Sequence, residues 1–162
     1  MNSISVSRNN LPEGEFKIGD TLYSVQDIEN QLNAILSVQK IDNWEISLVL
    51  ADDEYIRILN RDFRSKDEAT DILSFPQLDE AENEESFPGN DDSIFYAGDI
   101  VISLNSLKKN AGDFGVSEEE EFSRLLIHGI LHLSGLDHDT NSEKEPMLIL
   151  QEQILEKITK LL

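Results

Sequence analysis

The chain has 162 residues, of which 39% are hydrophobic and 28% charged, a size and balance typical of one folded globular domain. It contains no cysteine, which excludes disulfides, thiolate zinc sites and cysteine nucleophiles, and is consistent with a reducing cytoplasm. Thirteen Lys and Arg against 33 Asp and Glu give a net charge of −20, which argues against a polyanionic partner unless the basic residues gather in one place.

Strands and helices are predicted to alternate along the chain. Four stretches rich in β-branched and aromatic residues predict strands, at residues 4–8, 44–51, 70–76 and 95–103. Helical spacing of apolar residues predicts five helices: residues 24–38; a short helix that starts at Asp52 or Asp53, with Ile56, Leu59 and Phe63 as its apolar stripe; residues 103–115; a histidine-bearing helix after Ser117; and a last helix from about 145 to 162. This order predicts an α+β fold in a single domain spanning residues 1–162, with one small mixed sheet of about four strands packed with about five helices.

The sequence shows no signal for export or for insertion into a membrane. The N-terminus lacks a basic region followed by a long apolar stretch, and the most apolar internal run, residues 46–51, is far too short to span a bilayer. We therefore expect a cytoplasmic protein with no membrane partner.

Two acidic stretches supply much of the negative charge. Residues 78–92 hold seven carboxylates with Pro88 and Gly89 and no Lys or Arg, which indicates a solvated loop. The second stretch, SEEEE at 117–121, predicts a helix start in which Ser117 is the N-cap and Glu120 completes a capping box.

The basic residues are more concentrated. Four of the thirteen (Arg57, Arg61, Arg64 and Lys66) fall within ten residues, along the short helix and just beyond its end. For Arg57 and Arg61 a solvated face, with Arg57 paired to Asp53, is the favoured interpretation. Arg64 and Lys66 lie at the helix end, where a loop can present them to a ligand.

All three histidines of the chain lie in one window, HGILHLSGLDH at 128–138. His128 and His132 are four residues apart and therefore project from the same helix face. Gly135 is placed to end the helix, and the turn can bring His138 back to the same point. Three neutral imidazoles suit one zinc ion and leave its fourth position for water, while Asp137 and Asp139 could accept hydrogen bonds from an imidazole.

The spacing matches the peptidase motif H-E-x-x-H-x-x-G-x-x-H, in which the glutamate is the general base. Gly129 stands in place of that glutamate, so the peptidase chemistry lacks its base. We expect a glutamate introduced at position 129 to lie within reach of the metal. A zinc ion on three neutral ligands keeps its full charge of +2 and suits an anionic phosphodiester if cations help to hold the phosphate.

The histidine window, together with LNRDFRSKDEATDILSFP at 59–76, GDIVIS at 98–103 and MLILQEQIL at 147–155, resembles the YbeY family of bacterial rRNA maturation factors, which are metal-dependent endoribonucleases. The resemblance implies a zincin-like domain with one zinc ion on His128, His132 and His138, and the family's essential arginine falls on Arg64. It also implies cleavage of single-stranded RNA, in processing of the 3′ end of 16S rRNA and in ribosome quality control.

Two other functions remain open at this point. A zincin-type metallopeptidase is disfavoured by Gly129, and a ribosome-assembly binding factor with a structural zinc would need a carboxylate as fourth ligand. If the chain is the ribonuclease, we expect Arg64 and Lys66 to bind the RNA phosphate. Such an acidic nuclease would rely on partners, which the resemblance implies are the small ribosomal subunit, one of its proteins and an Era-type GTPase, with no role for DNA.

Overall fold

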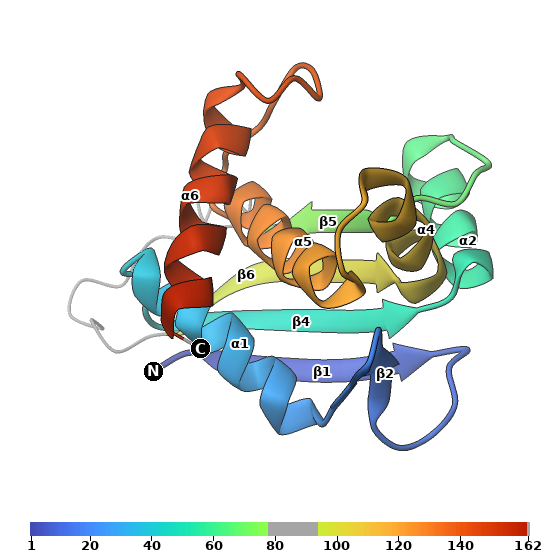
Figure 1. Cartoon of the computed structure of the whole chain (residues 1–162), viewed down its shortest axis with the longest axis horizontal. Helices are drawn as coiled ribbons and strands as arrows, with labels where there is room; N and C mark the ends of the chain where they lie inside the picture. The colour runs from blue at the N-terminus through green and yellow to red at the C-terminus, as the bar shows by residue number, and fades with distance from the viewer. Residues whose placement is uncertain (78–93, 162) are drawn as a thin grey trace.

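The computed structural model describes residues 1–77 and 94–161, so the acidic stretch predicted as a loop at 78–92 lies outside the described residues. Its main sheet has the strand order β1-β4-β6-β5 (Figure 1). The strands are β1 (Ser3–Asn9), β4 (Trp44–Ala51), β5 (Ile72–Pro76) and β6 (Phe95–Ser103). β1, β4 and β6 run parallel, whereas β5 pairs antiparallel with β6 at the edge. The prediction of a small mixed sheet of four strands is confirmed.

Five helices in the described residues surround this sheet, as predicted. They are α1 (Val25–Val38), α2 (Asp53–Arg64), α4 (Leu104–Phe114), α5 (Glu118–Leu133) and α6 (Pro146–Leu161). Because side chains alternate along a strand, Ile100 and Ile102 of β6 face one side of the sheet and Val101 faces the other. Ile100 and Ile102 belong to the larger core with α1, α5 and α6, and Val101 packs in a smaller core with Ile56 of α2. α2 therefore packs on the opposite face of the sheet from the larger core, and its start meets the start of α4 (Figure 1).

Helix starts follow the sequence closely, with two differences. Ser117 is the N-cap of α5, as predicted, and its side chain accepts a hydrogen bond from the backbone N–H of Glu120. The Glu120 carboxylate pairs with Arg124 instead of completing the predicted capping box. Of the two candidate caps of α2, Asp52 is the N-cap, and Asp53 instead accepts hydrogen bonds from Ser103 and Ser106 at the start of α4. Local polar side chains thus determine where these helices begin.

Two features of the fold escaped sequence reasoning. β2 (Phe16–Ile18) and β3 (Thr21–Tyr23) form a separate two-stranded sheet, and strands of three residues are too short for an alternating pattern to identify. Phe63, the last residue of the apolar stripe predicted for α2, is 68% exposed in the last turn of the helix, whereas Ile56 in the first turn is buried. Among the described residues, no helix combines the length and apolar character needed to cross a membrane.

Candidate metal centre

α5 brings the first two histidines together. Its buried residues include Phe122, Leu126 and Ile130, which hold the helix in the core. His128 and His132 are half-buried on one face of α5, and their Nε2 atoms are 3.0 Å apart.

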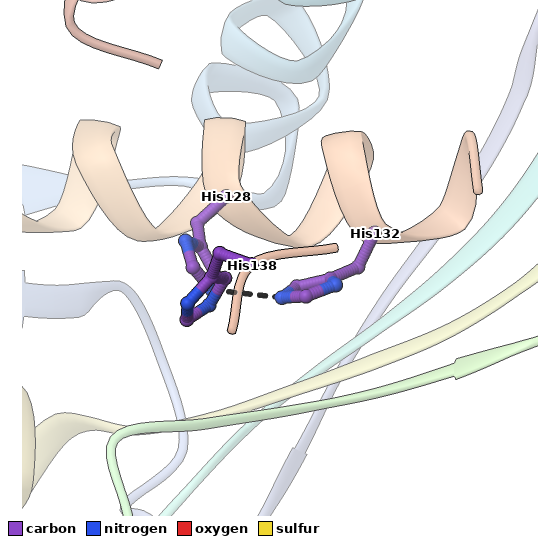
Figure 2. A group of neighbouring side chains, drawn as sticks. All are labelled: His128, His132 and His138. Carbon is purple, nitrogen blue, oxygen red and sulfur yellow. Dashed lines mark hydrogen bonds between the residues drawn. The ribbon is translucent and has the colours of Figure 1, made fainter. Parts of the chain in front are cut away.

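The turn after α5 delivers the third histidine. Gly135, at φ 96°, donates its N–H to the carbonyl of His132 at 3.0 Å, and the N–H of Leu136 reaches the carbonyl of Leu131 at 3.1 Å. This pair of bonds is a Schellman motif, which reverses the chain at a helix end. His138 consequently lies with its ring centroid 5.2 Å from that of His128 and 5.4 Å from that of His132. The three rings converge (Figure 2), with one ligand atom from each lying within 4.8 Å of the other two.

Each imidazole has an oxygen acceptor at its Nδ1. The distances are 2.7 Å from His128 to Oε1 of Gln151, 3.0 Å from His132 to the carbonyl of Leu136, and 2.8 Å from His138 to the carbonyl of Thr140. Because an oxygen acceptor requires a proton on Nδ1, each Nε2 carries a lone pair.

The electrostatics of the cluster fit a metal ion. Burial lowers the pKa of His128 and of His132, which favours neutral rings at pH 7. Two lone pairs whose nitrogens lie 3.0 Å apart repel each other unless a cation lies between them. Three neutral nitrogen donors with these fixed tautomers suit zinc or a similar divalent transition metal.

The cluster offers three protein ligands. In the part of the chain that the structure describes, these histidines form the one group of three or more side chains able to hold a metal. Asp137 does not act as a fourth member, since it is 85% exposed and lies 4.0 Å from Nδ1 of His132, away from the Nε2 atoms. A three-ligand site with an open position is typical of catalytic rather than structural zinc.

Arg64 lies in the same pocket as two of the histidines, His128 and His132. The pocket, of about 330 Å³, is lined by Arg64, Ile72, Ser74, Pro76, His128, His132, Gly135, Leu136 and Asp137. Arg64 ends α2 and donates from Nη2 to the carbonyl of Ser74 on the edge strand at 3.0 Å. Within the described residues this bond positions the side chain, and the guanidinium has further N–H groups that can donate to a ligand.

The other basic candidates lie elsewhere. Arg57 pairs with Asp67 at 2.8 Å, and Arg61 pairs with Asp62 at 3.1 Å, all four side chains being well exposed. The partner of Arg57 is therefore Asp67 and not Asp53, which bonds to α4. Lys66 is exposed and is not one of the described residues that line the pocket. The structure thus brings Arg64 to the histidines but not Lys66.

Sequence reasoning missed Gln151 and Ser74. Gln151 on α6 is 7% exposed and holds Nδ1 of His128, while Ser74 on β5 is 8% exposed and holds Arg64 through its carbonyl. The only signal for Gln151 was its place in the MLILQEQIL stretch, and a backbone carbonyl leaves no signature in a sequence at all.

Gly129 faces the core, not the metal. A Cβ atom built on this residue would lie 2.8 Å from Cδ1 and 3.1 Å from Cγ2 of Ile100 on β6. A glutamate at position 129 would therefore begin inside the apolar core. The expectation that it would lie within reach of the metal is corrected, because the glycine allows close packing of α5 on the sheet.

Comparison with known proteins identifies the family. The family model described as endoribonuclease YbeY matches residues 12–159. An endoribonuclease YbeY from Treponema denticola is 44% identical over 154 residues, covering 95% of this chain and 92% of the relative. Another, from a Sulfurihydrogenibium species, is 38% identical and covers 94% and 97%. The solution structure of TM1509 from Thermotoga maritima superposes with a TM-score of 0.59 at 25% identity, over 98% of this chain and 90% of that one. This chain belongs to the endoribonuclease YbeY family.

Proposed function

We propose that the protein is a metal-dependent endoribonuclease that cleaves single-stranded RNA at the pocket shared by the histidine cluster and Arg64. The observation that carries the proposal is the convergence of three imidazoles, two of which line a pocket with a guanidinium that a backbone carbonyl holds in place. Membership of a family named for endoribonuclease activity supports the same reaction.

The histidines and Arg64 have different proposed roles in the reaction. When bound, a divalent ion such as zinc would supply a Lewis acid, and three neutral ligands would leave its charge undiminished. The oxygen acceptors at Nδ1 keep each Nε2 free to act as a ligand. Arg64 would bind a non-bridging oxygen of the scissile phosphate and offset the charge that develops there.

The acidic character of the chain supports a dependence on partners. With a net charge of −20 and one arginine in the pocket, the protein is expected to bind free RNA weakly. We propose that it acts in the cytoplasm on 16S rRNA, at the 3′ end and in ribosome quality control, with RNA brought to it on the small ribosomal subunit. A small-subunit protein and an Era-type GTPase are the proposed partners.

The other functions have less support. A peptidase needs a general base beside the metal, and Gly129 packs against Ile100 at that position of the motif. A purely structural zinc needs a closed site, whereas His128 and His132 line an open pocket with Arg64.

The decisive experiment combines metal analysis with cleavage of a single-stranded RNA. We expect one metal ion per chain, cleavage that a chelator abolishes and that added Zn²⁺ restores, and no cleavage of casein. Arg64→Ala should lower RNA turnover by roughly 10²- to 10³-fold, the typical cost of removing one charge-stabilising donor, with metal content unchanged. Arg61→Ala, one turn earlier on the same helix, is the matched control and should retain activity. Full activity of Arg64→Ala, or cleavage of casein by the unmodified protein, would refute the proposal.

A further inference from the structure

Gln151 contacts the candidate metal centre through an amide that could face either way. Its Oε1 lies 2.7 Å from Nδ1 of His128, and its Nε2 donates to Oε2 of Glu152 at 3.2 Å. An amide can present either its oxygen or its NH₂ group to an imidazole. The oxygen selects the ring with a proton on Nδ1 and a lone pair on Nε2, and the NH₂ group selects the opposite tautomer.

The carboxylate of Glu152 decides between these orientations. Arg124 of α5 holds both of its oxygens, with Nε 3.0 Å from Oε2 and Nη2 2.9 Å from Oε1. Burial opposes ionisation of Glu152, but the hydrogen bonds from Arg124 and Gln151 outweigh it and lower the pKa of this carboxyl. An ionised carboxylate can only accept, so the NH₂ group of Gln151 must face Glu152 and its oxygen must face His128.

Arg124 is itself held in place from a second side. Its Nη1 lies 3.1 Å from Oε2 of Glu121, whose residue is 2% exposed. Arg124 therefore pairs both with the buried Glu121 on α5 and with the more exposed Glu152 on α6, so its position does not depend on Glu152 alone.

We infer that Arg124 and Glu152 set the tautomer of His128 through the amide of Gln151, and so keep its Nε2 available to the metal. These three residues are positioning residues, since none of them contacts the metal or the substrate. The inference rests on the metal site of the proposed function, but it concerns a tautomer that exists in the metal-free protein as well.

The first test replaces the amide. Gln151→Leu removes the acceptor while filling a similar buried space, and Gln153→Leu, at an exposed position on the same helix, is the control. We expect Gln151→Leu to raise the Kd for Zn²⁺, measured by competition with a chelator, by roughly 10- to 100-fold. Gln151→Glu, which keeps an acceptor at this point, should retain most of the affinity.

The second test replaces Glu152, the carboxylate that orients the Gln151 amide. Glu152→Ala frees the amide to turn, and we expect a smaller loss of Zn²⁺ affinity than for Gln151→Leu. Glu156→Ala, which removes an exposed pair with Lys160 on the same helix, is the control and should leave the affinity unchanged. Thermal unfolding of the metal-free variants separates this effect from a general loss of stability.

Nitrogen NMR of His128 in the metal-free protein reads the tautomer directly. We expect the proton on Nδ1 in the unmodified protein and a mixture or reversal in Gln151→Leu and Glu152→Ala. An unchanged tautomer and unchanged Zn²⁺ affinity in both variants would overturn the inference while leaving the metal site intact. Failure of the unmodified protein to bind Zn²⁺ would instead count against the proposed function, and the NMR result would still decide the inference.

Phe63 is an exposed aromatic residue next to Arg64 in the chain. Phe63 is 68% exposed at the end of α2, and its ring lies edge-on to that of Phe75, with centroids 5.5 Å apart. The guanidinium carbon of Arg64 lies 5.9 Å from the centre of the same Phe75 ring. Phe75 is thus a common neighbour that holds an exposed aromatic face close to the arginine of the pocket.

We propose that Phe63 stacks on an unpaired base of the RNA next to the phosphate bound by Arg64. Aromatic side chains bind bases of single strands in this way with little sequence preference, and a base stacked within a duplex is not free to do so. The proposal deepens the proposed function, because it supplies a physical reason for selection of single strands.

The test compares two equally exposed phenylalanines at helix ends. Phe114, which ends α4, is 67% exposed and lines a different hollow, together with Val116 and Arg124, so Phe114→Ala is the control for Phe63→Ala. We expect Phe63→Ala to raise KM for single-stranded RNA by roughly 5- to 100-fold with little change in kcat, and Phe63→Trp to restore it. Equal KM values for the two alanine variants would refute the stacking role. If the unmodified protein fails to cleave RNA, the proposed function fails, and binding of a fluorescent single strand to the same variants tests the stacking.

Discussion

At the scale of single residues, His132 is one of three imidazoles that each contact the other two. We expect His132→Ala to abolish stoichiometric metal binding, because two remaining ligands hold zinc poorly. Elemental analysis of the purified variant measures this, with circular dichroism as a check on the fold. Undiminished metal in the variant would show that the ion binds elsewhere.

Glu121 is a second residue whose role can be tested alone. It is 2% exposed, and burial raises the pKa of its carboxyl even though Arg124 opposes the shift. A group whose pKa is raised by folding stabilises the protein below its unfolded pKa and loses that contribution as the pH rises through the folded pKa.

Glutamine at this position copies the protonated acid at every pH. Glu121→Gln should therefore gain stability relative to the unmodified protein as the pH rises from about 4 to 7, since the ordinary pKa of Glu is near 4.3. Urea unfolding of both proteins across this range measures the difference. A difference in stability that does not change with pH would contradict the raised pKa.

At the scale of elements, the histidine-bearing helix α5 begins at a capping side chain. Ser117 accepts from the backbone N–H of Glu120 at 3.1 Å. We expect Ser117→Ala to lower the free energy of unfolding by about 1 kcal/mol, the typical cost of losing an N-cap. Ser37→Ala, at an exposed position within α1, is the control and should be close to neutral. Equal stabilities of the two variants by urea unfolding would show that the cap contributes little.

Gly129 lets α5 pack closely against Ile100 of β6. Gly129→Ala should destabilise the protein by about 1–3 kcal/mol, because the added methyl group would lie 2.8 Å from Cδ1 of Ile100. Adding Ile100→Val removes that atom, so the double variant should recover part of the loss. A double variant no more stable than Gly129→Ala alone, by urea unfolding, would show that the clash lies elsewhere. Gly129→Glu should unfold more readily still, since it buries a carboxylate in an apolar core.

At the scale of the whole molecule, the candidate metal centre joins α5, the turn after it and, through Gln151, α6. A ligand that binds only the folded state stabilises it by about 2.7 kcal/mol at a free concentration of 100 times its Kd. For a chain of this size we expect Zn²⁺ at that concentration to raise Tm by roughly 5–10 °C, and a chelator to reverse the rise. His138→Ala should remove the response while folding normally. A Tm that Zn²⁺ leaves unchanged would argue against binding at this site.

The elements and the histidine cluster could be predicted because their signals are local. Helical spacing puts His128 and His132 on one face, and a glycine at C′ permits the left-handed turn that returns His138. Caps such as Ser117 and Asp52 act on backbone groups within three residues, so the starts of the helices could be predicted as well. The short pair β2 and β3 could not, since three residues do not establish a period.

The sequence by itself determined the fold class, the four main strands, the five helices and three histidines able to share one ion. Only the tertiary structure decided that Arg64 and not Lys66 enters the pocket, because that depends on α2 ending beside the edge strand β5. The contact of Gln151 with His128 and the close approach of Gly129 to Ile100 are likewise decided by how α6 and β6 pack on α5. These contacts join residues far apart in the chain, and no local pattern of residues specifies which distant side chain or carbonyl will meet a given group.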